Sequence, residues 1–369
     1  MDRESEFSRV AIVGTGLMGG SFGLAIKNFY PERTVIGVDY GDEINKAIRR
    51  GAVDKGYGPE DLESAVSGSD LVVLATPIDG ILEFLEKLPG LLEGKTVVLD
   101  LGSTKKEICA RGWKAFENSS CNFVGGHPMT GAEIRGIAGA HPLLYENSTF
   151  VLVTSNGEPT KSSKKLENFL EGLGTEPRYL KPETHDRIVA RVSHLPQLIS
   201  ISLMKTVGEA EEPHDYLSLA GGGFRDMTRI AESPFGIWED IFATNAELIA
   251  EEVERFLKET RKTLESLDNE EIRREFEESA KFRDELPRSS KGISSSTFKV
   301  AVMIPDKPGA LAKLTSCLAE EGINIRDLEL QKVREDYGGT FQVYFDSLET
   351  AKKASKIMMN NGFESRVVD

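Results

Sequence analysis

Cysteine and histidine are scarce in this chain. The three cysteines, Cys109, Cys121 and Cys317, are odd in number and widely spaced, which argues against a disulfide framework and against a zinc site. The five histidines form no H-E-x-x-H or similar ligand pattern, so we predict no structural or catalytic metal. We therefore expect reduced thiols, as in a cytoplasmic protein.

Long apolar runs and positive charge are also in short supply. No stretch reaches the roughly 18 apolar residues of a membrane span, and residues 1–7 lack the apolar core of a signal peptide, so we expect no membrane association. The 45 basic residues face 60 acidic ones, and the net charge is −15. This balance argues against DNA or RNA as a partner, although it is compatible with a local basic pocket for a small anionic substrate.

The most informative stretch that is present is VAIVGTGLMG at residues 10–19. An apolar run leads into G-x-G-x-x-G, and an amphipathic segment follows at residues 21–28. In such a motif Gly14 allows a tight turn, Gly16 lets the backbone approach a pyrophosphate, and Gly19 lets the helix pack closely on its strand. The N-terminus of that helix offers free N–H groups to the phosphates.

A second apolar run, Thr34–Val38, ends at Asp39. An acidic residue at this place can accept hydrogen bonds from both ribose hydroxyls and would repel a 2′-phosphate, so we predict NAD rather than NADP as the cofactor. A glycine-rich turn without any cofactor is the alternative. The predicted cofactor-binding residues are Gly14, Gly16, Leu17, Met18, Gly19, Asp39, Thr76, Pro77 and Ser103.

Apolar runs alternate with helical patterns from Arg9 to about Gly126, which implies a parallel sheet covered on both faces. Ligands of such sheets bind beyond the carboxyl ends of the strands, and His127 and Pro128 are expected to follow one such end directly. The expected strands are 10–13, 34–38, 71–75, 96–101, 123–125 and 150–154. The expected helices are 21–28, 43–50, 78–88, 105–117 and 161–172.

Residues from 184 to about 281 have an almost wholly helical pattern. We expect long helices at 185–207, with a kink at Pro196, and at 237–267. By analogy, an all-helical domain after a dinucleotide-binding domain often closes the cleft and forms a homodimer.

The last part of the chain follows a segment, residues 287–297, that has little to bury and is interpreted as a linker. The order of expected elements beyond it is β-α-β-β-α-β, the ferredoxin-like arrangement. These elements are residues 298–304, 310–321, 324–332, 340–345, 348–361 and 363–368. The predicted organisation is thus a Rossmann-type α/β domain at 1–180, an all-helical domain at 181–286, the linker, and a ferredoxin-like α+β domain at 298–369.

Four motifs carry the polar groups of interest. They are DLGSTK at 100–105, GGHPMTGAE at 125–133, VSHLPQ at 192–197 and GGGFRDMTRIA at 221–231. Together they resemble the prephenate/arogenate dehydrogenase family of tyrosine biosynthesis, and the resemblance covers nearly the whole chain. The tail, with IPDKPGAL at 304–311 and EGINI at 321–325, resembles an ACT domain, a module that binds amino acids.

The resemblance implies NAD-dependent oxidative decarboxylation of prephenate to 4-hydroxyphenylpyruvate. In that reaction hydride leaves C4 of a cyclohexadienol, a base takes the 4-hydroxyl proton, and CO2 is lost as the ring becomes aromatic. His127 matches the family's base, and an imidazole is mostly neutral at pH 7. Outside this motif, a surface or hydrogen-bonded loop histidine is the plainer interpretation. Ser103 matches a serine near the same hydroxyl, and alone it is interpreted as a helix N-cap before Lys105.

The resemblance also assigns substrate-binding residues. Arg229 matches the arginine that holds the substrate carboxylate, which suits the planar donors of a guanidinium. Arg225 is the less favoured candidate, four positions away and so on the same face if both are helical; a surface ion pair is the alternative for either. His194 is expected to face the cleft, although a helix histidine is commonly a core residue. Glu133 is a candidate for holding a water or gating the entrance, or is simply solvated.

Gln197 departs from the family pattern, since many prephenate-using relatives have histidine there. Glutamine cannot carry a positive charge, so arogenate, with an amino acid side chain, is an alternative substrate. In the tail, the resemblance implies an effector site for L-tyrosine and feedback inhibition, with a purely dimerising module as the alternative. Its candidate residues are Asp306, Pro308, Gly309, Ala310, Leu311 and Asn324, the last placed on a strand.

Two further interpretations compete. A β-hydroxyacid dehydrogenase has a similar glycine motif but uses a lysine in its helical domain, whereas the motifs here centre on His194 and Arg229. A non-catalytic amino-acid or NAD sensor is the other, and the intact set of His127, Ser103 and Arg229 argues against it.

Overall fold

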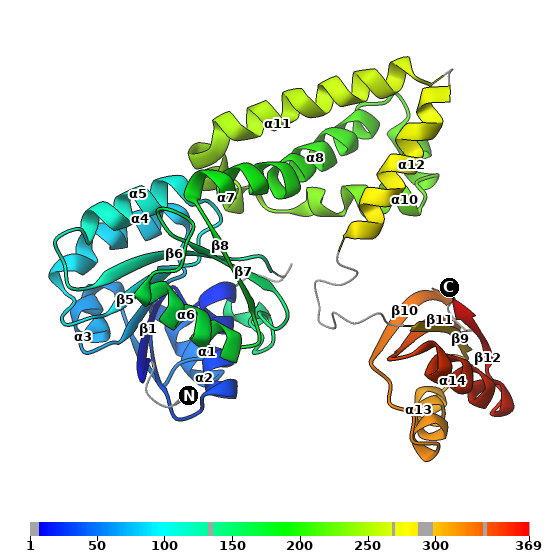
Figure 1. Ribbon diagram of the computed structural model, residues 1–369, viewed down its shortest axis with the longest axis horizontal. Coiled ribbons are helices and arrows are strands. Elements are labelled where there is room, and N and C mark those ends of the chain that lie inside the picture. Colours follow the sequence, from blue (N-terminus) through cyan, green and yellow to red (C-terminus); the bar gives the residue numbers. More distant parts are fainter. Residues whose placement is uncertain (1–6, 132–135, 268–269, 287–297, 335–337, 369) are drawn as a thin grey trace. The chain divides into compact units, whose positions relative to one another are not determined.

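The computed structural model describes residues 7–131, 136–267, 270–286, 298–334 and 338–368. The chain divides into two compact units, residues 1–292 and 293–369, which are described separately (Figure 1). Within the first unit we distinguish a sheet region, residues 7–180, from a helical region, residues 182–286. Among the described residues, no helix combines the length and the apolar character needed to cross a bilayer.

The sheet region contains an eight-stranded sheet in the order β3-β2-β1-β4-β5-β6-β7-β8. Neighbouring strands are parallel except for β6 and β7. Strands β3 and β8 were not predicted. The strands are β1 (Arg9–Val13), β2 (Thr34–Val38), β3 (Lys55–Tyr57), β4 (Leu71–Leu74), β5 (Val97–Asp100), β6 (Asn122–Pro128), β7 (Thr149–Val153) and β8 (Glu176–Leu180).

Both faces of this sheet are covered, as the continuous apolar strands require. On β1, Val10 and Ile12 belong to one core cluster, and Ala11 and Val13 belong to the other. Helices α1, α2 and α6 contribute to the first cluster, and α3, α4 and α5 to the second. These helices are α1 (Leu17–Phe29), α2 (Gly41–Arg49), α3 (Leu62–Val66), α4 (Ile78–Lys87), α5 (Lys106–Ala115) and α6 (Lys161–Gly172).

Strand β6 is longer than predicted, and this corrects the expected place of His127. The pairing of β6 with β5 ends at Val124, but Gly125–Pro128 pair with the antiparallel β7. His127 and Pro128 are therefore on the strand instead of after it, because the unforeseen antiparallel neighbour continues the ladder. His127 still lies beyond the carboxyl end of β5.

The helical region begins with α7 (Pro182–Val189), which continues through a π-helical turn, Ala190–His194, into α8 (Leu195–Gly208). Pro196 lies in the first turn of α8, where its missing N–H is tolerated, and the irregular turn precedes it. The remaining helices are α9 (Pro213–Ser218), α10 (Gly222–Thr228), α11 (Glu239–Glu265) and α12 (Glu270–Glu285). Two 3₁₀ turns, Arg229–Glu232 and Phe235–Ile237, join α10 to α11.

The second unit contains an antiparallel sheet in the order β10-β11-β9-β12, and the predicted ferredoxin-like element order is present. Asn324 was placed on a strand, but it lies in the connection before β10, because pairing with β11 begins only at Asp327. The elements are β9 (Phe298–Ile304), α13 (Ala310–Glu320), β10 (Asp327–Arg334), β11 (Gly338–Phe345), α14 (Leu348–Asn360) and β12 (Glu364–Val368).

Candidate active site

The glycine-rich loop joins β1 to α1, and its three motif glycines meet different surroundings. Gly14 has φ +90°, and a Cβ there would lie 2.8 Å from the carbonyl carbon of Ala75. A Cβ on Gly19 would lie 1.9 Å from the oxygen of Gly14. A Cβ on Gly16 would meet no atom within 4 Å. The loop thus needs two glycines for its own packing, while Gly16 presents bare backbone to open space beside the N-terminus of α1.

Asp39 follows β2 and lies beside this loop. Its Oδ2 accepts hydrogen bonds from the N–H (2.7 Å) and the hydroxyl (3.0 Å) of Thr15, and its Oδ1 accepts one from the N–H of Tyr40 (2.8 Å). Leu17 and Met18 are half-buried in the first turn of α1. Thr76 and Pro77 follow β4, next to β1 in the sheet. The structure therefore brings the predicted cofactor residues to one edge of the sheet.

The connection from β5 to α5 is organised by a buried ion pair. Asp100 and Lys105 are both fully buried and in contact. The Asp100 carboxylate also accepts the N–H of Gly102 (2.8 Å) and that of Gly126 on β6 (3.1 Å). One carboxylate therefore holds both the segment that carries Ser103 and the strand that carries His127.

Ser103 does not cap α5, contrary to the prediction. The helix begins at Lys106, and its N-cap residue Lys105 makes no side-chain capping bond. Instead, the N–H groups of Lys105 and Lys106 donate to the Asp186 carboxylate at 2.7 and 2.8 Å. The cap is therefore supplied from α7, while the hydroxyl of Thr104, just before α5, is hydrogen-bonded to Thr244 on α11 (2.8 Å). Ser103 is half-buried at the same edge of the sheet.

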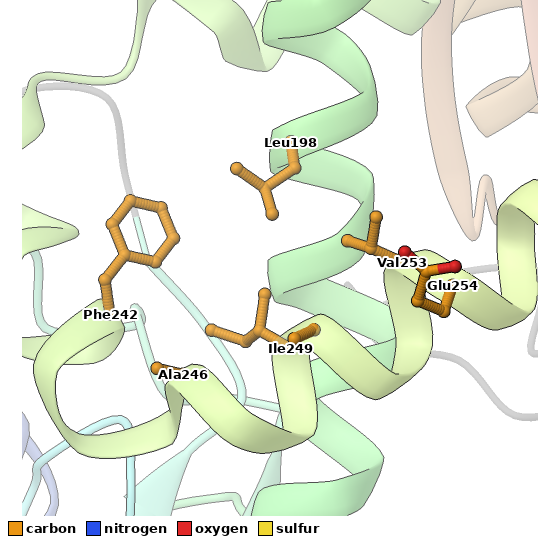
Figure 2. Close-up of a pocket in the computed structure, with 7 residues that line it drawn as sticks. Leu198, Phe242, Ala246, Ile249, Val253 and Glu254 are labelled. Atoms are coloured by element: carbon orange, nitrogen blue, oxygen red, sulfur yellow. The ribbon is translucent and has the colours of Figure 1, made fainter.

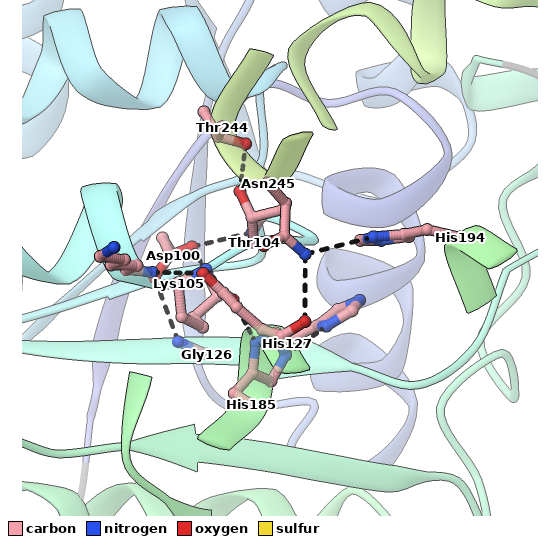
Figure 3. A network of polar contacts seen from close by, with 12 residues as sticks. Asp100, Thr104, Lys105, Gly126, His127, His185, His194, Thr244 and Asn245 are labelled. Atoms are coloured by element: carbon pink, nitrogen blue, oxygen red, sulfur yellow. Dashed lines mark hydrogen bonds and ion pairs between the residues drawn. The ribbon is translucent and has the colours of Figure 1, made fainter. Parts of the chain in front are cut away.

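His127 contacts a second histidine that the motifs did not indicate. Its Nδ1 lies 2.8 Å from Nε2 of His185, and Nδ1 of His185 lies 2.7 Å from Oδ1 of Asp186 (Figure 3). His185 and Asp186 are adjacent on α7 and nearly fully buried. The imidazole of His185 thus links His127 on β6 to the Asp186 carboxylate that caps α5.

The imidazoles of this cluster are held uncharged. Burial lowers the pKa of His127 well below its ordinary value, and the nearby His185, Lys105 and His194 lower it further. Burial also lowers the pKa of His185, partly opposed by its hydrogen bond to Asp186. Burial lowers the pKa of His194 to about 4. All three side chains are therefore neutral near pH 7.

His194 is joined to the same network through α11. Its Nδ1 lies 3.3 Å from Nδ2 of Asn245, which also donates to the backbone oxygen of Asp186 at 3.0 Å (Figure 3). Asn245 has a non-helical backbone (φ −134°, ψ 17°) inside α11. The ring of Trp238 meets His194 edge-on, with ring centroids 5.9 Å apart. The non-helical backbone of α11 at Asn245 thus accompanies the entry of its side-chain amide into the cluster.

The candidate substrate-binding arginines are not on one helix face, which corrects that expectation. Arg225 lies within α10, but α10 ends at Thr228 and Arg229 begins a 3₁₀ turn with a different residue period. Both side chains are exposed, and Nε of Arg225 donates to the carbonyl of Ala220 (3.2 Å). Glu133 lies outside the described residues.

Gln197 is buried on α8, one turn after His194. Its Nε2 donates to the carbonyl of Ile230 at 3.0 Å, just after Arg229. Its Oε1 is buried and has no hydrogen-bond partner among the described residues. The amide orientation follows from this contact, because a carbonyl can only accept and therefore selects the amide nitrogen.

The candidate effector residues of the second unit surround the start of α13. Asp306 and Pro308 lie in the turn after β9, Gly309 has φ +84° at the N-cap, and Ala310 and Leu311 begin the helix. Asn324 lies beyond the other end of α13. These positions describe a turn and a connection, and by themselves they do not test a ligand site.

The motifs missed several residues of the cluster. Asp100 and Lys105 lie inside the DLGSTK motif, and a buried acidic residue at a strand end was a usable signal. The adjacent His185 and Asp186 at the start of the helical region were another. Nothing in the sequence distinguishes Asn245. In the part of the chain that the structure describes, no group of three or more histidine, cysteine or acidic side chains could hold a metal ion.

The fold and this edge of the sheet are those of a nucleotide-binding oxidoreductase. Profiles of two families match the chain, "Prephenate dehydrogenase, nucleotide-binding domain" at residues 22–178 and "Prephenate dehydrogenase, dimerization domain" at residues 181–281. The prephenate dehydrogenase of Bacillus subtilis is 32% identical over 353 residues, which cover 94% of each chain. The chain therefore belongs to the prephenate dehydrogenase family, and the predicted class of enzyme, a dehydrogenase, is confirmed.

Two solved structures are also similar. Prephenate dehydrogenase from Aquifex aeolicus, in complex with hydroxyphenyl propionate and NAD+, has a TM-score of 0.69 and 31% identity, covering 77% of this chain and all of that one. Arogenate dehydrogenase from Synechocystis has a TM-score of 0.66 and 26% identity, covering 76% of this chain and all of that one. Both likenesses leave about a quarter of this chain uncovered.

Proposed function

We propose that this protein oxidatively decarboxylates prephenate to 4-hydroxyphenylpyruvate with NAD+ as the oxidant. The observation that carries the proposal is the position of His127, an uncharged imidazole beyond the end of β5 on the ligand edge of a dinucleotide-binding sheet. A neutral imidazole can take the proton of the substrate's 4-hydroxyl group. Ser103 lies on the neighbouring connection, which the same Asp100 carboxylate holds.

The residues present fit NAD. The bare backbone at Gly16 and the N-terminus of α1 suit a pyrophosphate, and the Asp39 carboxylate suits the two hydroxyls of a ribose. The complex of the Aquifex enzyme with NAD+ supports the same cofactor here. When bound, NAD+ accepts the hydride from C4 of the substrate.

His127 and Arg229 carry out the other steps of the proposed reaction. His127 takes the hydroxyl proton as the hydride leaves, so that C4 becomes a carbonyl carbon. The Arg229 guanidinium, in the helical region, binds the substrate carboxylate. The ring then loses CO2, the electrons of the broken bond make the ring aromatic, and His127 returns its proton to the 4-oxygen.

Arogenate is the second candidate substrate, and Gln197 favours it. The unpaired Oε1 of Gln197 is an acceptor in a buried place, where an unsatisfied polar atom is costly. The amino group of arogenate's side chain can donate to it, whereas the pyruvyl side chain of prephenate offers only acceptors. The likeness to the Synechocystis arogenate dehydrogenase supports keeping this alternative.

The test is an assay of NADH formation by the full-length protein with each substrate and with NAD+ or NADP+. We expect turnover with NAD+ and a higher kcat/KM for prephenate than for arogenate; the reverse order would favour the arogenate alternative. Gln197→His should move the ratio of kcat/KM toward prephenate if Gln197 contacts the side chain. An absence of NADH with both substrates would overturn the proposed reaction and leave the sensor interpretation.

We also propose that the helical region forms a homodimer. An apolar groove of about 350 Å³ lies between α8 and α11, and Figure 2 shows Leu198 facing Phe242 and Ile249 across it. The match to a dimerization domain at residues 181–281 supports an interface between two copies in this region. The large apolar side chains that this region exposes include Val192, Tyr216, Leu217, Leu219, Met227, Phe235, Ile237, Phe256, Leu257, Leu264, Phe276 and Phe282.

For the second unit we propose an ACT domain that binds L-tyrosine near the turn of residues 306–311 and inhibits the enzyme. The Bacillus relative aligns with 94% of this chain, so its similarity extends into this unit, whereas the complete Aquifex chain corresponds to only 77%. This difference in coverage supports a regulatory unit that is added to the catalytic part. Truncation near residue 290 should abolish inhibition by tyrosine; equal sensitivity of the two proteins would defeat the allosteric proposal.

A further inference from the structure

We propose that Asp186 and His185 are positioning residues that fix the tautomer of His127, so that its Nε2 carries the lone pair and faces the reaction. The inference deepens the proposed function and depends on it only for the role of His127 as the base. It concerns two side chains of α7 that the motifs did not single out.

Asp186 is the acceptor at one end of the series of hydrogen bonds that leads to His127. Its two carboxylate oxygens accept the N–H groups of Lys105 and Lys106, which have no acceptor capacity. Burial raises the pKa of Asp186, but the hydrogen bonds from His185 and from these backbone groups overcome that effect and hold the pKa below its ordinary value. Asp186 is therefore an ionised, acceptor-only group, and the hydrogen in its 2.7 Å contact with Nδ1 of His185 belongs to the histidine.

The position of the hydrogen on His185 determines the position of the hydrogen on His127. A neutral imidazole with its hydrogen on Nδ1 has a lone pair on Nε2. Nε2 of His185 lies 2.8 Å from Nδ1 of His127, so the hydrogen of that contact must come from His127. The charged or titratable groups around the pair are Lys105 and Asp100 from the β5–α5 connection and His194 from the π-helical turn. The cation among them, Lys105, disfavours a protonated His185.

His127 is thereby left with its hydrogen on Nδ1 and its lone pair on Nε2. No hydrogen bond to Nε2 is found among the described residues. This is the nitrogen that can accept the substrate's proton. Once it does so, the imidazolium remains hydrogen-bonded through His185 to the Asp186 anion, which stabilises the positive charge.

The Asp186 carboxylate also has a structural role, so His185 is the better residue to replace. Asp186 caps α5, so its replacement also weakens the start of that helix. His185 makes no such contact, and its two ring contacts can be removed or imitated separately. His185→Leu removes both polar atoms at similar size. His185→Gln retains an amide that can donate to Asp186 and an oxygen that can accept from Nδ1 of His127.

The primary test is direct observation of the tautomer. Full-length protein labelled with ¹⁵N-histidine contains five imidazoles, whose protonated and unprotonated nitrogens are distinguished by their ¹⁵N shifts. We expect His127 to show Nδ1–H and an unprotonated Nε2, and His185→Leu to shift it toward the Nε2–H form. His185→Gln should keep the wild-type tautomer. His214→Gln, at an exposed position on α9, is the control and identifies one signal.

Kinetics supply the second readout. His185→Leu should lower kcat by about 10²-fold with KM within about threefold, and His185→Gln should recover most of that loss. The inference is overturned if wild-type His127 shows the Nε2–H tautomer, or if His185→Leu leaves both the tautomer and kcat unchanged. If neither prephenate nor arogenate is turned over, the proposed function fails, while the NMR result still decides the tautomer.

Discussion

The sheet region and the helical region bury their side chains in opposite ways. Strands β4 and β5 are buried along their whole length, and their apolar residues lie in two cores. Helix α8, by contrast, buries only Gln197 and Ser200, both polar, and α12 buries nothing. The sheet region thus holds most of two apolar cores, the second of which also includes Ala190, Ile241 and Ile249 of the helical region. The helical region directs polar side chains such as Gln197 and His194 inward and exposes many large apolar side chains.

The largest effect is expected where the two regions meet. His127→Asn keeps the approximate shape of the side chain but removes the base, so kcat should fall by about 10²- to 10⁴-fold while KM changes little. Steady-state kinetics with NAD+ and the preferred substrate measure this change. His141→Asn, in an exposed loop of the sheet region, is the matched control. An unchanged kcat in His127→Asn would show that the base lies elsewhere.

The two regions can also be compared by the stability that one ion pair contributes in each, Lys105–Asp100 in the sheet region and Arg191–Glu252 in the helical region. Lys105→Met leaves the fully buried Asp100 charge without its partner, so it should lower the free energy of unfolding by about 3–5 kcal/mol. Arg191→Met removes an exposed partner of the buried Glu252, which keeps a second ion pair with Arg255 (3.4 Å), so it should cost no more than about 1 kcal/mol. Urea unfolding followed by circular dichroism measures both. Equal losses would contradict the difference between a carboxylate that loses its buried cation and one that keeps a second cation.

Acid should weaken the helical region's contribution to the cluster. The pKa of His194 is about 4 in the folded protein, below the roughly 6.5 of an unfolded histidine. The unfolded chain therefore binds the proton more readily, and the stabilisation that is complete above pH 6.5 is lost as the pH falls toward 4. Between pH 7.5 and pH 5 the wild type should lose about 2 kcal/mol more than His194→Gln. Equal pH dependence of the two proteins in urea unfolding would contradict the burial of this imidazole.

The smallest effect is expected at the cofactor edge of the sheet region. Asp39→Asn removes the charge but keeps one acceptor oxygen, so KM for NAD+ should rise by about tenfold and discrimination against NADP+ should weaken. KM for the substrate should stay within about twofold, since in the described part of the chain the Asp39 carboxylate is hydrogen-bonded to Thr15 of the glycine-rich loop and to the N–H of Tyr40. Initial rates with both dinucleotides measure these changes, and an unaltered preference would remove Asp39 from the ribose site.

Within the sheet region, the sequence predicts some elements much better than others. Apolar strands that are buried on both faces are easily recognised, and β1, β2 and α6 lie within a residue of their predicted ends. Strand β8, with the sequence EPRYL, lacks that pattern and was missed. Strand β6 exceeded its prediction because only the fold reveals its antiparallel neighbour β7.

The motifs predicted His127 and the residues of the cofactor edge as site residues, but they did not indicate the side chains that hydrogen-bond to His127 and His194. His185 lies 58 positions from His127, and no local pattern relates the two. The cap of α5 comes from Asp186 on another helix, 80 positions from Lys106, and no local pattern indicates it. Asn245 reaches His194 only because α11 departs from helical geometry at that residue.

The Asp100 carboxylate has a consequence for how substrate preference can change. It receives N–H groups from both Gly102 and Gly126, so the spacing between Ser103 and His127 is built into the sheet before any ligand arrives. Substitutions that adapt the enzyme to a new side chain on the ring are therefore expected to accumulate on α8 and after α10. The hydride-transfer geometry would be inherited unaltered as the preferred metabolite changes.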